Sequence, residues 1–235
     1  MIAEHFFYKG VQRPRLLGER PVMMHSLDLS LGSDAALDEE YLEKLQQAQT
    51  ALSPVLLSDH LCFTQSGGIE LGHLNPIPPT KAVAARVASK IREAKERTGA
   101  LFLLESILTH LSISGDLHAR EFYRRVCKDA DCGMLLDVTN ILVNCHNFKK
   151  DPIAFIEELD LSRVVQLHAV EYTTGHDGTR FDSHTENTND DVFALCQEVI
   201  SRAPVKAVII ERDGNYPEPE RLLYEVDRLQ NMIDE

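Results

Sequence analysis

Cysteine is scarce in this sequence, and its placement excludes two kinds of structure. The 235 residues contain an odd number of cysteines and no CxxC pair: Cys62, Cys127, Cys132, Cys145 and Cys196. Neither a disulfide framework nor a zinc-thiolate knuckle fits cysteines that are so widely scattered. We therefore expect a protein of a reducing compartment and predict a cytoplasmic localisation.

Positive charge and long apolar runs are also lacking. The chain has 24 basic residues against 37 acidic residues, which gives a formal net charge of -13. This balance repels phosphate backbones and argues against nucleic-acid binding. No apolar run approaches the roughly 18 residues of a membrane-spanning helix, and the start of the chain has no basic and apolar leader. The sequence therefore predicts neither membrane insertion nor export.

What the sequence does contain is an alternation of apolar runs and helix-like segments. The strand-like runs span residues 1–8, 22–30, 54–63, 100–107, 133–143, 164–168 and 205–211. Helical spacing or helix start signals are found at 34–50, 80–98, 116–128 and 188–202, after Asp151-Pro152, and from Glu218 onward. The region from Gly67 to Pro79 is predicted to be a long loop.

This alternation favours a particular fold class. Continuous apolar runs are typical of strands covered on both faces, and strands that alternate with helices are typical of a parallel sheet. A closed (β/α) barrel satisfies both conditions at this chain length. About seven strand segments are present where eight close the common barrel, so one strand is hidden or the chain begins one unit late. The prediction is an α/β, TIM-like barrel that forms a single domain over residues 1–235.

Polar side chains end strand after strand. They are His25, Asp59, His60, Glu105, Asp137, Asn140, His168, Glu211 and Asp213, and the loop after His168 adds Asp182 and His184. In a parallel barrel the carboxyl ends of all strands lie on one face, so these residues are expected to converge there. Histidines and carboxylates without thiolates suit iron, manganese or zinc. The number of candidates favours two or more metals that share carboxylates.

Each of these residues also has an ordinary structural interpretation. A histidine such as His25 can be a hydrogen-bonded core residue, and Asp59, Asp137 or Asn140 can cap a strand end or a loop amide. Glu105 is harder to explain in this way, as is the glutamate that ends the last strand. Each follows a run of aliphatic residues and would be buried unpaired without a cation. The set as a whole therefore favours metal binding.

A series of short motifs resembles a known family. The motifs are MHSLDLSLGS, SDHLCF, HLNPIPPT, LLES, CGMLLDVTN, LHAVEY, DSHTE and IIERD. Their order, from about Glu4 to Glu220, resembles the multinuclear non-heme iron-dependent oxidative enzymes, a family long catalogued as a domain of unknown function. Its best-known member is the methanobactin biosynthesis oxidase. Any one motif is weak, but the spaced set is specific.

The resemblance implies a TIM-like barrel that holds two or three iron ions and uses dioxygen to oxidise a cysteine of a ribosomally made peptide in natural-product biosynthesis. It implies a precursor peptide as partner and a second protein that presents this peptide. The metal ligands carried over by motif are His25, His60, Glu105, Asp137, Asn140, His168, Asp182, His184 and Glu211. Asp59 and Asp213 are implied as catalytic neighbours that orient the ligands or serve the reaction.

The chain differs from the family pattern in several places. Family members usually carry Glu-Asn where this chain has Glu105-Ser106, and Trp at the positions of Phe63 and Arg212. The family's glycine-rich first strand and most of a second strand normally precede the segment matched by MIAEHFF, and they have no counterpart in this sequence. A barrel without its first strand exposes an edge. We therefore expect either a truncated start, or a partner or second copy, as in a homodimer, that covers the gap.

Two other functions are compatible with the same residues. A divalent-metal sugar isomerase or phosphodiester hydrolase on a related barrel uses similar sets of histidines and carboxylates, since fold alone does not decide chemistry. A truncated member that keeps its metal-binding residues but acts as a non-catalytic scaffold is the third hypothesis. An activity that depends on oxygen favours the oxidase over the isomerase or hydrolase. Failure of the protein to take up metal favours the non-catalytic scaffold.

Overall fold

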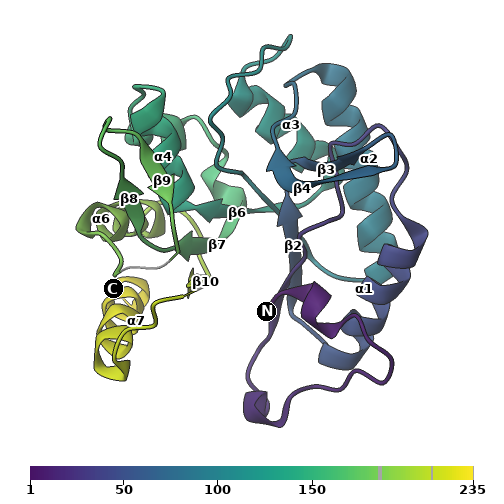
Figure 1. The fold of residues 1–235 in the computed structure, drawn as a ribbon, viewed down its shortest axis with the longest axis horizontal. Helices are drawn as coiled ribbons and strands as arrows, with labels where there is room; N and C mark the ends of the chain where they lie inside the picture. The colour runs from purple at the N-terminus through teal and green to yellow at the C-terminus, as the bar shows by residue number, and fades with distance from the viewer. Residues whose placement is uncertain (185–186, 213, 235) are drawn as a thin grey trace. The chain divides into compact units, whose positions relative to one another are not determined.

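The computed structural model describes residues 1–184, 187–212 and 214–234. Asp213, one of the two predicted catalytic neighbours, lies outside the described residues. The chain divides into two compact units, whose elements are labelled in Figure 1. The first unit contains residues 1–107 and 111–133, and the second contains 108–110 and the chain from Met134 onward. The single domain expected over residues 1–235 stays a prediction.

The first unit is built on three parallel strands, with the second of them in the middle: β1 (Met23–His25), β2 (Leu56–His60) and β5 (Phe102–Glu105). Every residue of β2 and β5 is buried, which fits the apolar residues that begin both strands, Leu56-Leu57 and Phe102-Leu103-Leu104. His60 is paired with Glu105 in the register, and His25 is paired with Ser58. The strands therefore deliver His25, His60 and Glu105 to the same edge of the sheet.

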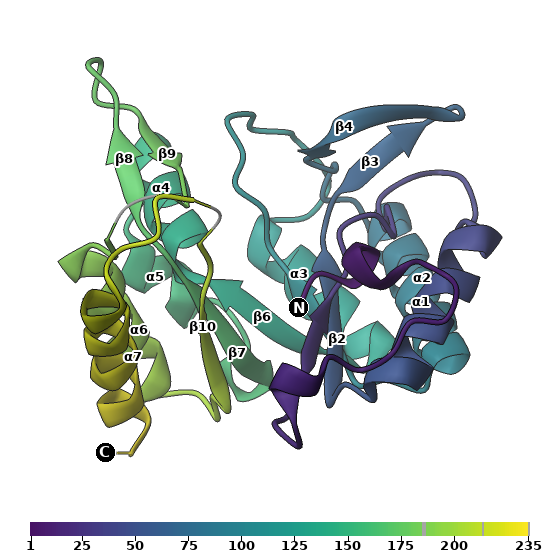
Figure 2. The same cartoon turned by 60° about the horizontal axis from the view of Figure 1, so that its bottom comes forward.

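Three helices and two short 3-10 helices complete the first unit: α1 (Glu39–Leu52), α2 (Lys81–Thr98), α3 (Ala119–Ala130), η1 (Ala3–Phe6) and η2 (Arg15–Leu17). Figure 2 shows α1 and α2 side by side. The side chain of Asp38 accepts a hydrogen bond from the Tyr41 amide, and Thr80 accepts one from the Val83 amide. The Asp38 cap explains why α1 begins later than the periodicity of residues 34–50 suggests.

Two strand predictions in the first unit are wrong. Residues 1–8 contain η1 rather than the end of a strand, although Ile2 makes one parallel bridge to His25. The run at 22–30 is a strand only as far as His25. Beyond this point its main chain is held by side chains, since the Leu27 amide donates to Glu4 and the Leu29 amide donates to Asp59. Such bonds compete with sheet pairing.

The prediction of a long loop after Gly67 is also wrong for residues up to Asn75. Residues on both sides of Gly67-Gly68 pair as an antiparallel hairpin of β3 (Phe63–Ser66) and β4 (Ile69–Asn75), which Figure 2 shows clearly. Both glycines have positive φ angles, 59° and 77°. A two-residue turn of this kind suits the twist of a hairpin and requires residues that tolerate positive φ. The glycine pair is therefore a turn signal rather than the start of irregular chain.

The second unit is built on three further parallel strands, again with the second of them in the middle: β6 (Gly133–Asp137), β7 (Val164–Ala169) and β10 (Ala207–Ile210). Asp137 is paired with His168 in the register. The Glu211 amide, one residue past β10, donates to the Ala169 carbonyl. Three predicted ligands thus follow or end neighbouring strands at one edge, as expected for a parallel sheet.

The remaining elements of the second unit are α4 (Val138–Asn147), α5 (Pro152–Glu157), η3 (Leu161–Arg163), β8 (Tyr172–Thr174), β9 (Arg180–Asp182), α6 (Asp190–Ile200) and α7 (Pro219–Asp234). The strand predicted over 133–143 is wrong in its second half, because α4 begins directly after Asp137. The carboxylate of Asp137 accepts a hydrogen bond from the Asn140 amide and so caps this helix. β8 and β9 form an antiparallel hairpin that ends at Asp182. None of the described helices is long and apolar enough to cross a membrane.

Gly32 lies in the loop that follows β1, and its position leaves no room for a side chain. A Cβ atom there would lie 2.2 Å from Cγ2 of Ile77 and 2.9 Å from the Cys62 carbonyl oxygen. We expect Gly32→Ala to lower the free energy of unfolding by about 1–3 kcal/mol through overpacking. Urea denaturation measures this loss, and adding Ile77→Ala should restore part of it. If Gly32→Ala has the same free energy of unfolding as the wild type, the loop can shift to accept the methyl group and the prediction is wrong.

Candidate metal centre

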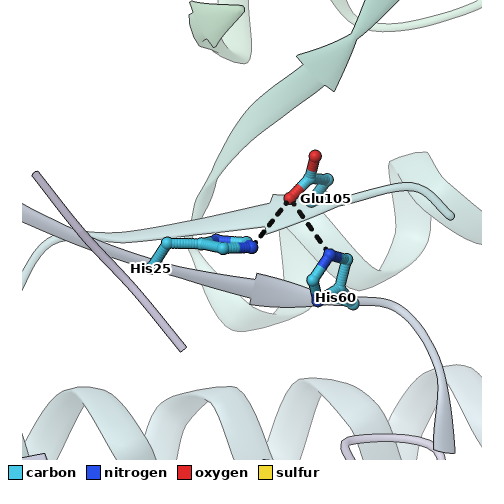
Figure 3. Close-up of side chains that lie close together, drawn as sticks. All are labelled: His25, His60 and Glu105. Carbon is cyan, nitrogen blue, oxygen red and sulfur yellow. Dashed lines mark ion pairs between the residues drawn. The ribbon is translucent and has the colours of Figure 1, made fainter. Parts of the chain in front are cut away.

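The first cluster of candidate ligands consists of His25, His60 and Glu105, which end β1, β2 and β5 (Figure 3). The Nε2 atoms of both histidines lie 3.5 Å from the same carboxylate oxygen, Oε2 of Glu105. The side chains come from three strands and point toward one another. One ligand atom from each residue lies within 4.8 Å of the other two. Ligand atoms about 3–3.5 Å apart match those around a cation that binds nitrogen and oxygen at roughly 2.0–2.2 Å.

Burial makes a cation at this cluster favourable. The residues are 6%, 9% and 1% exposed for His25, His60 and Glu105 respectively. A buried carboxylate is costly unless a positive charge or hydrogen bonds compensate it. The Nδ1 atom of His60 is also buried without a hydrogen-bond partner among the described residues. A set of two imidazoles and one carboxylate fits iron, manganese or zinc, and the cluster therefore fits the predicted class of metals.

Ser58 contacts the ring nitrogen of His25 that does not face Glu105. Its hydroxyl oxygen lies 2.8 Å from Nδ1 of His25 and 3.5 Å from the carbonyl oxygen of Met24. If the hydroxyl donates to that carbonyl, it accepts the proton of Nδ1, and the lone pair of the ring is then on Nε2. The nitrogen that faces Glu105 is thus available as a ligand. The sequence did not predict Ser58, because a serine inside a buried strand has no pattern that indicates a contact with a histidine of the neighbouring strand.

Asp59 is buried and contacts the loop after β1 and the backbone of His60. Its carboxylate accepts hydrogen bonds from the hydroxyl of Ser26 at 2.6 Å, from the Leu29 amide at 3.2 Å and from the His60 amide at 2.6 Å. Burial raises the pKa of Asp59 well above its usual value, and these hydrogen bonds oppose the shift. These contacts join the loop after β1 to the His60 amide. The orienting role of Asp59 and its role in the reaction both stay predictions.

Glu4 and Tyr41 are further supports of this loop that sequence reasoning missed. The Glu4 carboxylate accepts hydrogen bonds from the Leu27 amide and from the hydroxyl of Tyr41. The same hydroxyl accepts a hydrogen bond from the Asp28 amide. Burial raises the pKa of Tyr41, with further contributions from the charges of Asp59 and Glu4, so the phenol stays protonated as a donor.

The second cluster consists of Asp137, Asp182 and His184, all in the second unit. One ligand atom from each lies within 4.8 Å of the others, and Nε2 of His184 lies 2.8 Å from Oδ2 of Asp182. His184 has a φ angle of 52°, which is uncommon for a residue with a side chain. Such strain is frequently found at functional sites, where the surrounding structure maintains it.

The electrostatics of the second cluster favour a positive charge. Burial raises the pKa of the Asp182 carboxyl, although the hydrogen bond and charge of His184 oppose this. Burial alone would lower the pKa of His184, but the hydrogen bond that its ring donates to Asp182 and the charges of Asp182, Glu211 and Asp137 raise it to about 9. In the absence of metal, the imidazolium therefore supplies positive charge to a group of carboxylates. A divalent cation can supply the same charge.

His168 and Glu211 form a pair beside the second cluster, since a ligand atom of His168 lies within 4.8 Å of one of Asp137. Nδ1 of His168 lies 3.1 Å from Oε2 of Glu211, and Nε2 of His168 lies 2.9 Å from the amide nitrogen Nε2 of Gln166. Asn140 contacts the second cluster through its backbone amide, which donates a hydrogen bond to the carboxylate of Asp137 at 2.9 Å. The side-chain oxygen of Asn140 is buried without a hydrogen-bond partner among the described residues. Buried polar atoms are normally paired, so this oxygen is available to a cation or a donor.

All predicted metal ligands lie within the described residues. Each is buried or half-buried, and each lies beside another predicted ligand. His25, His60 and Glu105 come together in the first unit, and Asp137, Asp182 and His184 in the second, where His168 pairs with Glu211. The ligands themselves had a signal in the sequence, since each ends or follows an apolar strand. Gln166 had the pattern of an ordinary strand residue, and nothing local to it indicated a contact with the site.

Comparisons with known proteins agree with this arrangement. A family model described as RiPP precursor modification enzyme MbnB/TglH/ChrH matches residues 1–234. A UPF0276 protein of Anaeromyxobacter sp. (strain Fw109-5) is 34% identical over 236 residues, which cover 97% of this chain and 82% of the relative. A UPF0276 protein of Acinetobacter baylyi is 31% identical over 218 residues, with coverage of 93% and 76%.

A solved structure supports the fold class. The IOLI protein, solved with a bound zinc atom, matches with a TM-score of 0.53 at 12% identity, and the match covers 99% of this chain and 80% of that protein. At this identity the likeness concerns the fold alone. It confirms the predicted TIM-like α/β class, since such neighbours are TIM-barrel-like proteins.

Proposed function

Because the chain belongs to the MbnB/TglH/ChrH family of RiPP precursor modification enzymes, we propose that it is a multinuclear iron-dependent oxidase that modifies cysteine residues of a ribosomally made peptide with dioxygen. The family assignment confirms the resemblance drawn from the sequence motifs. The observation that carries the proposal is the presence of a histidine and carboxylate cluster in each unit, buried in the first unit and partly buried in the second. The number of candidate ligands in these groups favours more than one metal ion.

The residues of the two clusters would hold the metals. His25, His60 and Glu105 would hold one ion, and Asp137, Asp182 and His184 would hold another, with His168 and Glu211 as further ligands in the second unit. When bound, iron supplies the redox chemistry by which dioxygen oxidises a thiol. The chain's own contribution is to fix the ligands on strand ends and to keep water from them by burial.

The oxidised cysteine comes from the substrate rather than from this chain. Cys62 is the cysteine nearest in sequence to a predicted ligand, His60, and it is fully buried. Burial raises the pKa of its thiol, and the negative charges of Asp59, Asp28 and Glu105 raise it further. A thiol that stays protonated is a poor ligand and a poor nucleophile. A precursor peptide is therefore the proposed source of the thiolate, and a peptide-presenting protein is the proposed partner.

Iron content and oxygen dependence test this function. Protein purified without oxygen and supplied with Fe(II) is expected to hold more than one equivalent of iron per chain. A short cysteine-containing peptide encoded beside this gene, with its presenting partner, should then change mass only when oxygen is admitted. The same peptide with serine in place of cysteine is the control. Less than one iron per folded chain would refute the multinuclear proposal, and oxygen-independent activity with Mg, Mn or Zn would favour the isomerase or hydrolase.

A further inference from the structure

The two ring nitrogens of His168 have different neighbours. Nδ1 faces a carboxylate, Oε2 of Glu211, at 3.1 Å, whereas Nε2 faces the side-chain amide of Gln166 at 2.9 Å. Gln166 and His168 are two positions apart on β7, so their side chains leave the strand on the same face. Both residues are 2% exposed. Neither ring nitrogen therefore exchanges its neighbour for bulk water without a rearrangement of buried side chains.

A neutral imidazole has one nitrogen with a proton and one with a lone pair, and only the latter can bind a metal. The hydrogen bond made by the other nitrogen decides which is which. The amide of Gln166 can present either its oxygen or its nitrogen to the ring, because a half-turn of the amide exchanges them. Its oxygen, Oε1, is buried without a hydrogen-bond partner among the described residues. A half-turn would place this unused acceptor on the proton of Nε2.

We propose that Gln166 is a positioning residue that assigns Nδ1 of His168, rather than Nε2, to a divalent cation shared with Glu211. With Oε1 of Gln166 accepting the Nε2 proton, the lone pair of the ring lies on Nδ1, the nitrogen that faces Glu211. With the amide NH2 toward the ring instead, Nε2 accepts and Nδ1 carries the proton toward Glu211. The orientation of the Gln166 amide thus decides whether Nδ1 of His168 has a lone pair for a metal or carries a proton.

The first cluster provides a contrast within the same chain. There Nε2 of His25 and Nε2 of His60 face the carboxylate, and the hydroxyl of Ser58 engages Nδ1 of His25. In the second unit the amide of Gln166 occupies the Nε2 side, so the opposite nitrogen faces the carboxylate. The inference rests on the metal binding in the proposed function, but it is independent of which metal binds and of any oxidation.

Zinc provides a probe that requires neither iron nor oxygen. The full chain, with histidines labelled isotopically on both ring nitrogens, is titrated with zinc and followed by long-range proton–nitrogen correlation spectra, and His168→Asn identifies the signals. Zinc is expected to shift Nδ1 of His168 while Nε2 keeps its proton. Gln166→Met should mix the two tautomers and weaken zinc binding about 10-fold, within the range for removal of a ligand's hydrogen-bond partner. Gln166→Glu, which keeps the acceptor, should retain the wild-type pattern.

The outcomes separate this inference from the proposed function. Zinc on Nε2 of His168 would overturn the inference and leave metal binding intact. Unchanged tautomer and zinc affinity in a folded Gln166→Met variant would overturn it as well. A His168 that does not respond to zinc at all would overturn both the inference and the assignment of His168 as a ligand. The wild-type spectrum decides the nitrogen even if the methionine variant fails to fold.

Discussion

Glu225→Ala is expected to lower the free energy of unfolding by about 3–5 kcal/mol, because it leaves a buried arginine without its counter-charge. Oε2 of Glu225 lies 2.9 Å from Nη2 of Arg212, and the two side chains are 0% and 4% exposed. Nε and Nη1 of Arg212 are buried and have no hydrogen-bond partner among the described residues. The mutation therefore removes the anion that compensates this guanidinium.

The same carboxylate connects α7 to two segments beside the second cluster. It accepts hydrogen bonds from the amide and the hydroxyl of Thr188, both at 3.2 Å. Thr188 follows the segment of Asp182 and His184, and Arg212 directly follows Glu211. We therefore expect Glu225→Ala also to weaken metal binding in the second unit, beyond its effect on stability.

Two further variants isolate the cause of the destabilisation. Arg221 contacts Glu225 at 3.2 Å, but its side chain is 41% exposed, so Arg221→Ala should cost no more than about 1 kcal/mol. Replacing both Arg212 and Glu225 by leucine should recover much of the loss, because the buried charges disappear together. Chemical denaturation measures the free energy of unfolding of each variant. The values can be compared if the dependence on denaturant concentration has the same slope in all variants. A loss below about 1 kcal/mol for Glu225→Ala would mean that Arg212 reaches water or another anion.

Glu105→Gln is the second change for which we expect a large effect. It should lower the metal affinity of the first cluster about 100-fold or more, above the range for loss of an indirect contact. Modification of the precursor peptide should fall by at least the same factor. One oxygen of Glu105 lies 3.5 Å from both His25 and His60, so the substitution removes the only anion that this cluster contributes. A neutral amide of the same shape keeps the packing but not the charge.

The metal-free protein is expected to respond in the opposite way. A carboxylate that is 1% exposed between two imidazoles carries a desolvation cost that the amide avoids. Metal-free Glu105→Gln should therefore unfold at the same or a higher denaturant concentration than the metal-free wild type. Glu70→Gln, the same substitution at an exposed position of β4, is the control. Full metal content in Glu105→Gln, measured by elemental analysis, would remove the first cluster from the proposed centre.

Local sequence carried enough information for the strands and for most of the candidate ligands. Glu105 follows three buried apolar residues of β5, and a strand that is covered on both faces leaves few uses for a carboxylate at its end. The run after Gly133 shows the limit of this approach. Its apolar residues continue past Asp137, and apolar content alone does not separate a buried strand from a buried helix. The Asp137 cap decides the change to α4.

The sequence by itself determined the fold class, the family and the residues that end each strand, because periodicity and strand-end chemistry are local properties of the chain. Only the tertiary structure decided what supports those residues. Glu225 has the pattern of an ordinary helical glutamate four positions after Arg221, yet it is fully buried against Arg212 and Thr188. Gln166 has the pattern of an ordinary strand residue, yet it contacts one particular nitrogen of His168. Such contacts depend on how separate segments pack, and no local pattern encodes them.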